Sequence, residues 1–177
     1  MKRLMLLRHA KAGRGEPDDH KRALIERGRS DAARIGRFMH DDVYLPDVVL
    51  CSTSVRTKDT VKHLLPALGF KPAVHYLSEL YLAEPELIVS LVRRTPDEAG
   101  SLMIVGHNPG IAECAVRLAR VPADRKVRKR YDAMEEKFST GALAVIDFEV
   151  RKWSDVAPGE GELDAFVRPK DLDSSKT

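Results

Sequence analysis

The 177-residue chain has only two cysteines, Cys51 and Cys114, and neither belongs to a CxxC pair. A disulfide framework needs more cysteines than this, so the pattern favours a reducing compartment, and we expect a cytoplasmic protein. No apolar run approaches the roughly 18 residues of a membrane-spanning helix. The apolar stretch 4–7, behind the basic amino terminus, is too short for a signal peptide. The sequence therefore predicts neither a membrane segment nor a targeting segment.

An excess of charge of one sign is also missing, because 30 Lys and Arg stand against 27 Asp and Glu, a net charge of +3. This mildly basic balance does not by itself indicate nucleic acid, and it is compatible with an anionic ligand. The most basic stretch, 125–130, lacks interleaved aromatic side chains apart from Tyr131, so RNA binding is not expected. The simpler interpretation of this stretch is a solvated loop. The alternative is a docking surface for an acidic phosphoprotein.

Motifs of several other chemistries are absent. The chain has no GxxxxGK[ST] segment, which argues against an NTPase. Cys51 precedes Arg56 as in the cysteine phosphatases, but the interval is one residue too short and contains no glycine, so we interpret Cys51 as a buried strand residue. Metal-ligand spacing is missing among His40, His63 and His75, and we expect neither a metal nor another cofactor.

Apolar residues make up 43% of the chain, enough for one sizeable core, and charged residues make up 32%, enough to solvate its surface. No internal repeat and no linker is visible. The sequence therefore predicts a single domain over residues 1–169, followed by a flexible tail over residues 170–177.

Short apolar runs alternate with segments of helical spacing along the chain. The runs predict strands over residues 4–7, 47–51, 73–77, 102–105 and 142–146. Residues 162–167 alternate between apolar and polar, as in an antiparallel edge strand. Helices are predicted over residues 27–40, after a cap at Ser54, from Pro85, and after Asn108 as N-cap with Pro109 at the first position. This order predicts a three-layer α/β/α sandwich with a mostly parallel central sheet and an antiparallel C-terminal edge.

Charged side chains follow the carboxyl ends of the predicted strands, and ligands of open parallel sheets bind beyond those ends. Arg8 and His9 follow the first strand, Arg56 the second, Glu79 the third and His107 the fourth. Arginine forks bind phosphoryl oxygens through paired hydrogen bonds, and helix amino termini add a preference for anions. Because a neutral imidazole is a competent nucleophile toward phosphorus, these residues predict phosphoryl transfer through a phosphohistidine.

The charges at this edge affect the two histidines differently. Nearby arginines disfavour protonation of His9, which keeps its lone pair available. His107 would help most when protonated, so a bound phosphate or the Glu79 carboxylate would have to offset the same field. Glu84 is a rival carboxylate, although it precedes a helix-starting proline and is also explained as a favourable charge at that terminus. Arg22 is the loop residue that we expect to contact substrate.

Three segments resemble the histidine phosphatase superfamily, which includes the phosphoglycerate mutases. Residues 7–10 (Leu-Arg-His-Ala) resemble its Arg-His-Gly signature. Residues 52–60 are similar to its S-x-x-x-R-[TA]-x-x-T segment, and residues 105–109 (Val-Gly-His-Asn-Pro) to its second-histidine segment. Together the motifs cover roughly residues 1–167 in order and spacing, which makes the resemblance specific.

Further features resemble the SixA-like phosphohistidine phosphatase branch. These are the small size of the chain, the GHNP form of the second-histidine segment, and the run 22–24 (Arg-Ala-Leu) followed by Gly28. One residue departs from the pattern, because Ala10 stands where the signature has glycine. An alanine there requires a negative φ or accepts slight strain.

The resemblance implies roles for the residues at the predicted sheet edge. It implies that His9 is the transiently phosphorylated nucleophile and that Arg8, Arg56 and His107 form the phosphate pocket. Glu79 is similar in placement to the general acid of the larger mutase branch, although SixA-like members often manage without one. The implied fold is phosphoglycerate mutase-like, and the implied activity needs no metal.

The leading hypothesis is a phosphatase that removes phosphate from a phosphohistidine on a protein. An imidazole becomes a good leaving group once protonated, and the lack of a long insert between strands suits a macromolecular substrate. The first alternative is a phosphatase of a small phosphomonoester, such as a sugar phosphate or nucleotide, which needs Glu79 as a working acid. The second is a non-catalytic module that binds phosphate or an acidic protein. Under each hypothesis we expect no nucleic acid and no membrane as partner, and a monomer.

Overall fold

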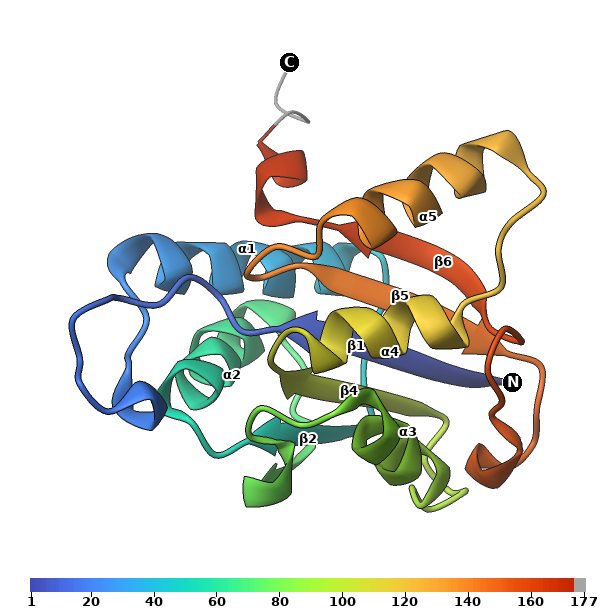
Figure 1. Cartoon of the computed structure of the whole chain (residues 1–177), viewed down its shortest axis with the longest axis horizontal. Helices are drawn as coiled ribbons and strands as arrows, with labels where there is room; N and C mark the ends of the chain where they lie inside the picture. The colour runs from blue at the N-terminus through green and yellow to red at the C-terminus, as the bar shows by residue number, and fades with distance from the viewer. Residues whose placement is uncertain (174–177) are drawn as a thin grey trace.

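A six-stranded sheet forms the middle layer of the protein (Figure 1). The computed structural model describes residues 1–173, and the strands lie in the order β3-β2-β4-β1-β5-β6. Strands β1 to β4 are parallel, and β5 is antiparallel to its neighbours β1 and β6. The strands are β1 (Lys2–Arg8), β2 (Val48–Ser52), β3 (Ala73–Leu77), β4 (Ser101–Gly106), β5 (Leu143–Phe148) and β6 (Glu162–Val167).

Five helices cover the two faces of this sheet (Figure 1). They are α1 (Glu26–Asp41), α2 (Val55–Leu68), α3 (Pro85–Arg93), α4 (Gly110–Leu118) and α5 (Arg125–Glu136). Apolar side chains of α1 and α2 share one core with the sheet, and those of α3, α4 and α5 share the other. The predicted sandwich with its antiparallel edge is confirmed.

Strand β1 explains why a central strand reads as an unbroken apolar run. Leu4 and Leu6 lie in the core beneath α3, α4 and α5, whereas Met5 and Leu7 lie in the core beneath α1 and α2. Alternate side chains of a strand point to opposite faces, so a strand covered on both sides must be apolar at each position. All four side chains are fully buried.

Residues 125–130 belong to helix α5 and not to the predicted loop. The Asp124 side chain caps the helix by accepting from the backbone amides of Lys126 and Val127, at 2.9 and 3.1 Å. Tyr131 and Met134 are buried on the inner side of the helix. The basic residues lie on its outer side. The segment is therefore an amphipathic helix, although its many basic residues led us to predict a solvated loop.

The predicted cap of α4 is wrong as well. The helix begins at Gly110 with Pro109 as its N-cap, and the Asn108–Pro109 peptide bond is cis. The Asn108 side chain donates instead to the carbonyl oxygen of Phe138, at 2.8 Å. The amide therefore joins β4 to the segment that precedes β5.

The C-terminal segment is ordered further than the sequence predicts. Residues Pro169–Leu172 form the 3-10 helix η4, and its N-cap residue Arg168 is paired with Asp171. Asp173 accepts from Arg34 on α1. The predicted tail is therefore structured as far as residue 173, and its remainder, 174–177, lies outside the described residues. Within residues 1–173, none of the helices is long and apolar enough to cross a membrane.

Candidate active site

Four of the predicted site residues, Arg8, His9, Arg56 and His107, meet at the carboxyl ends of β1, β2 and β4, on the left of Figure 1. In the parallel register of β1 and β4, Arg8 pairs with Gly106, so the next residues, His9 and His107, come side by side. Their ring centroids are 5.4 Å apart. Arg56 enters from the first turn of α2, directly after β2. The topology thus brings together residues up to 99 positions apart, since 107 − 8 = 99.

His9 is held as a neutral imidazole with one free nitrogen. Its Nδ1 lies 2.8 Å from the carbonyl oxygen of Ala10 and donates to it, which leaves the lone pair on Nε2. The side chain is only 7% exposed. Burial lowers the pKa of His9 to about 4, with help from Arg56 and Arg8, although the bond to Ala10 opposes the shift. The ring is therefore unprotonated at neutral pH.

Ala10 fits its position without strain. It is fully buried, and the two non-glycine residues with positive φ within residues 1–173 are Val43 and Leu82, so its own φ is negative. Its amide donates to the Thr60 hydroxyl at 2.9 Å, and that hydroxyl donates to the carbonyl of Arg56 at 2.7 Å. The Thr60 side chain on α2 thereby anchors the loop that carries His9.

His107 is buried opposite His9. Its Nε2 lies 2.8 Å from the Ser52 hydroxyl, and its Nδ1 is buried without a hydrogen-bond partner. When Ser52 donates to Nε2, the ring proton sits on Nδ1, which is then a donor. Burial, Arg56 and His9 lower the pKa of His107 to about 3, while Asp19 acts in the opposite direction. A bound anion would raise this pKa.

The two arginines keep unpaired donors at the same edge. Arg8 donates through Nη1 to the carbonyl of Phe138 at 3.1 Å, and Arg56 donates through Nη1 to that of Asp19 at 2.7 Å. The Nε atoms of both arginines are buried without a partner. Together with Nδ1 of His107, these donors suit an anion with several oxygens. Within residues 1–173, no group of His, Cys, Asp and Glu is placed to hold a metal ion.

Asp19 and Tyr81 are site residues that the sequence analysis missed. The Asp19 carboxylate accepts from Arg56 and Arg22, each at 3.0 Å, and from the Tyr81 hydroxyl. The Tyr81 ring packs edge-on against His107, with centroids 5.4 Å apart. Asp19 begins the short 3-10 helix η1 (Asp19–Lys21), 37 residues from Arg56 and 62 from Tyr81, so no local pattern reveals these contacts. The i,i+3 spacing to Arg22 is the one signal that was available.

No family model matches the chain, but individual proteins do. An uncharacterized Mycobacterium tuberculosis protein is 33% identical over 168 residues, which are 93% of this chain and 100% of that one. A solved structure from Nakamurella multipartitia, assigned as the phosphohistidine phosphatase SixA, is 31% identical with a TM-score of 0.81 over 95% of this chain and 96% of that one. A second, from Agrobacterium tumefaciens, is 30% identical with a TM-score of 0.78, over 95% and 98%.

The chain belongs to the SixA-like histidine phosphatases. This confirms the predicted family and fold, and it makes the protein a phosphatase of a superfamily that uses a histidine nucleophile. A SixA structure with bound tungstate is 19% identical, has a TM-score of 0.77 and shares the fold.

In this SixA-like phosphatase, the two carboxylates predicted as acids are both exposed to solvent. Glu79 is exposed on the 3-10 helix η2 (Ser78–Leu80), and Glu84 is exposed at the N-cap of α3. Neither side chain forms a hydrogen bond or ion pair with a residue in 1–173. Arg22, in contrast, is near enough to contribute to the lowered pKa of His9, and its Nε donates to the carbonyl of Gly13 at 2.9 Å.

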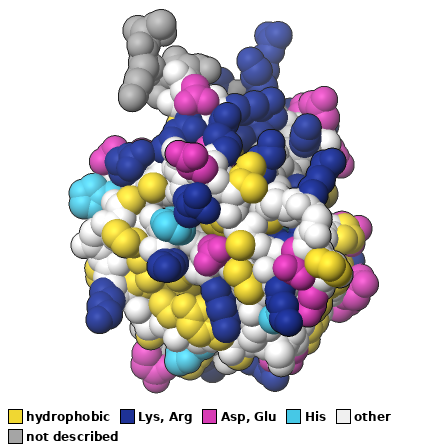
Figure 2. Space-filling model, turned by 90° about the vertical axis from the view of Figure 1, so that its left-hand side faces the viewer, with side chains coloured by type: hydrophobic (Ala, Val, Ile, Leu, Met, Phe, Trp, Pro, Cys, Tyr) yellow, Lys and Arg dark blue, Asp and Glu magenta, His cyan; other side chains and the backbone are white. Residues whose placement is uncertain are grey.

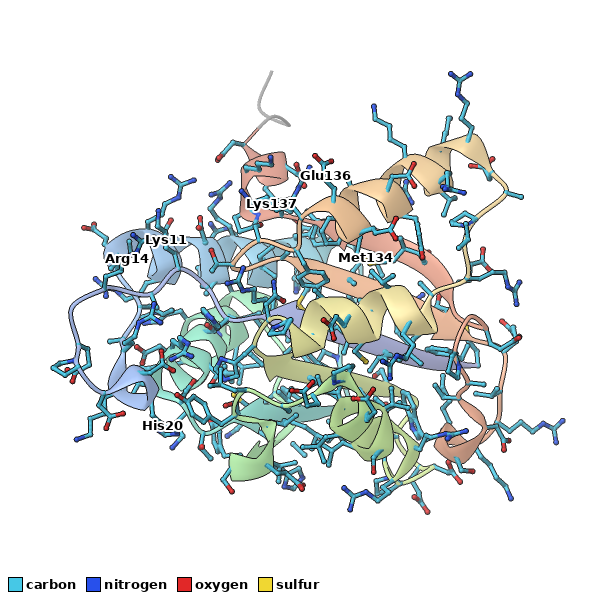
Figure 3. The ribbon with its side chains drawn as sticks, in the orientation of Figure 1. Lys11, Arg14, His20, Met134, Glu136 and Lys137 are labelled. Atoms are coloured by element: carbon cyan, nitrogen blue, oxygen red, sulfur yellow. The ribbon has the colours of Figure 1, made fainter. Side chains whose placement is uncertain are left out.

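A groove of about 580 Å³ lies beside the phosphatase site, between α4 and the end of α5. Arg8 and Asn108 of the site line it, and so do Met134, Glu136 and Lys137 at the C-terminal end of α5 (Figure 3). The remaining lining residues are Ala112, Glu113, Val116, Arg117, Glu135 and Phe138. The groove could therefore receive whatever is attached to a phosphoryl group bound at Arg8.

Proposed function

We propose that the protein hydrolyses phosphohistidine on a substrate protein through a phosphohistidine intermediate at His9. The observation that carries the proposal is the state of His9, a buried neutral ring whose Nδ1 is bonded to Ala10 and whose Nε2 keeps its lone pair. Three buried donors without partners, on Arg8, Arg56 and His107, lie at the same sheet edge.

The first step transfers the phosphoryl group to the enzyme. The Nε2 lone pair of His9 forms a bond to phosphorus, and the bond from phosphorus to the substrate nitrogen breaks with its electron pair going to that nitrogen. Arg8 and Arg56 neutralise the charge on the phosphoryl oxygens, and His107 donates to them. In the second step water attacks phosphorus, the electron pair of the P–N bond returns to Nε2, and the proton that the water gives up passes to a phosphate oxygen, so phosphate leaves as its singly charged anion.

The protein substrate class is supported by two independent points. The solved relatives from Nakamurella multipartitia and Agrobacterium tumefaciens carry the name phosphohistidine phosphatase. In addition, an imidazole leaving group needs less help from an acid than an alcohol does, and neither Glu79 nor Glu84 forms a hydrogen bond or ion pair with a described residue of the site.

A small phosphomonoester is the second candidate substrate. The groove beside Arg8 favours it, because 580 Å³ lies within the range of small-molecule pockets. This candidate requires an acid for the alcohol, and Glu79 is the residue that we would assign to it.

For the setting of the reaction we propose a monomer in the cytoplasm that acts without nucleic acid or membrane. The two cysteines are buried and free, which suits a reducing compartment.

The test compares a chemically phosphorylated, phosphohistidine-bearing protein with p-nitrophenyl phosphate, both with a metal chelator present. We expect wild type to favour the phosphohistidine protein and to carry an acid-labile label on His9. His9→Ala should lower turnover about 10³-fold or more, whereas His75→Ala, the same change at an exposed histidine, should leave it within about twofold.

Other outcomes point to the alternatives. Faster turnover of the ester, with a collapse in Glu79→Gln, would favour the small phosphomonoester. Phosphate binding without turnover of either substrate would favour the non-catalytic module and overturn the proposal.

A further inference from the structure

We propose that Asp19 selects the leaving group, by accepting a hydrogen bond from the ring N–H of the imidazole that departs from phosphorus. The inference rests on the proposed phosphohistidine phosphatase activity and names the residue that would favour phosphoramidates of imidazole over phosphate esters. It assigns a role to a carboxylate whose contacts with Arg56 and Tyr81 leave no local sequence signature.

The Asp19 carboxylate has room for one more donor. A carboxylate offers about four acceptor positions on its two oxygens. Oδ2 accepts from Arg56 and Tyr81, whereas Oδ1 accepts from Arg22 alone. The side chain is 47% exposed, so the remaining position on Oδ1 is open to a ligand that arrives from solvent.

Asp19 also lies on the side where the leaving group must be. His9 is 7% exposed and Arg56 and His107 are each 3% exposed, so these groups form the floor of the site and Asp19 lies at its mouth. In-line transfer places the leaving group opposite the attacking Nε2, toward that mouth. Arg56 links the two levels, because it donates both to the backbone carbonyl and to the carboxylate of Asp19.

The contacts of Asp19 make it an acceptor and not an acid. Tyr81, Arg22 and Arg56 hold the pKa of Asp19 well below its usual range, so it stays ionised. An anion at the mouth stabilises a protonated imidazole ring, but it opposes the negative oxygen that forms when an ester is cleaved. Among the carboxylates considered for the site, Glu79 and Glu84 form no hydrogen bond or ion pair with its described residues.

In the proposed step the substrate ring is bonded to phosphorus through one nitrogen and carries a proton on the other, which donates to Asp19. As Nε2 of His9 bonds to phosphorus, the P–N bond of the substrate breaks and its electron pair goes to the substrate nitrogen. The ring then leaves as a neutral imidazole that still holds its proton, so no proton transfer accompanies the step.

A different explanation is that Asp19 blocks the arginines as an internal substitute for phosphate. The donors predicted for the phosphoryl group oppose this explanation, because the Nε atoms of Arg8 and Arg56 and Nδ1 of His107 remain unpaired while Asp19 is in place. Asp19 therefore occupies the neighbouring position and leaves these donors free.

The experiment measures kcat/KM of Asp19→Asn on a phosphohistidine peptide and on p-nitrophenyl phosphate. Loss of one charge-assisted hydrogen bond should lower the first value about 10- to 100-fold, and the second should stay within about threefold or rise. The loss on the peptide should grow as pH increases. In the variant no carboxylate stabilises the protonated substrate ring, so the ring loses its proton at a lower pH than it does in the wild type. Asp18→Asn is the matched control, since Asp18 lies next in the chain and caps the 3-10 helix η1 (Asp19–Lys21) outside the site.

Equal losses on both substrates would mean that Asp19 only orients Arg56, and gains on both would mean that it blocks the site. Either result overturns the inference, as does an Asp19→Asn variant that turns over the peptide like wild type. Failure of the wild-type enzyme on the peptide would instead overturn the proposed function itself.

Discussion

His9 combines burial, positive neighbours and one backbone acceptor, and each of these has a separate effect. Burial and the arginines disfavour the charged ring, whereas the bond to Ala10 determines which nitrogen carries the proton. A histidine without the carbonyl would divide its proton between both nitrogens. The local backbone thus decides which atom faces the substrate.

This environment makes a testable difference to titration. NMR of the His9 ring should give a pKa of about 4 in the folded protein, against about 6.5 for a free histidine. The unfolded chain binds the proton more readily than the folded protein does. The contribution of His9 to the free energy of unfolding should therefore be at its maximum above pH 6.5 and decrease as the pH falls toward 4. His9→Gln should show a smaller loss in the same range, and a His9 ring that titrates near pH 6.5 would contradict the account.

At the scale of elements, Gly28 lets helix α1 contact the loop behind His9. A Cβ at this position would lie 2.1 Å from the carbonyl oxygen of Lys11. That carbonyl also accepts from the amide of Ile25, and Ala12 forms a β-bridge with Leu24. The glycine of the SixA-like pattern is therefore required by a backbone-to-backbone approach, and not by an unusual φ.

Gly28→Ala should lower the free energy of unfolding by about 1–3 kcal/mol, although alanine is the better helix former. Ser30→Ala, an exposed position on the same helix, should change stability by no more than about 0.5 kcal/mol. Urea denaturation of both variants measures the difference. A Gly28→Ala protein as stable as Ser30→Ala would show that the loop moves freely away from the helix.

At the scale of the whole molecule, basic residues gather on the upper part of the face shown in Figure 2. Lys11 follows the His9 loop and Lys137 precedes Phe138, whose carbonyl binds Arg8, so both lie close to the site (Figure 3). The basic run that the sequence analysis considered for docking begins at the other end of α5 (Figure 1). Any electrostatic effect on a phosphoprotein should therefore come mainly from the residues near the site.

Two triple variants with the same change in charge separate these surfaces. In one variant Lys137 and two basic residues of the segment that follows His9, Lys11 and Arg14, are replaced by Ser (Figure 3). In the other, Arg125, Lys126 and Lys129 are replaced by Ser. We expect the first to lower kcat/KM on an acidic phosphohistidine protein about 3- to 10-fold and to weaken its salt dependence, with little change for p-nitrophenyl phosphate. A larger effect of the second variant would return the docking role to α5.

Local patterns predicted most of the elements because each leaves a mark within a few residues. The strand over residues 73–77 and the antiparallel strand over 162–167 match β3 and β6 in their bounds. Helix α5 was not predicted because it has many charged residues on its outer side and few buried ones. The predicted Asn108 cap was wrong because that side chain binds the carbonyl oxygen of Phe138, which is distant in the chain.

By itself the sequence determined the layer order and the approach of Arg8, His9, Arg56 and His107, because side chains that follow parallel strands must meet at one edge. Only the tertiary structure decided which carboxylate contacts this site. Glu79 follows the edge strand β3 yet is exposed to solvent, whereas Asp19 reaches Arg56 and Tyr81 from the single 3-10 turn η1 in the connection between β1 and α1. Strand ends have fixed positions in a sheet, but the path of a loop depends on contacts between residues distant in the chain.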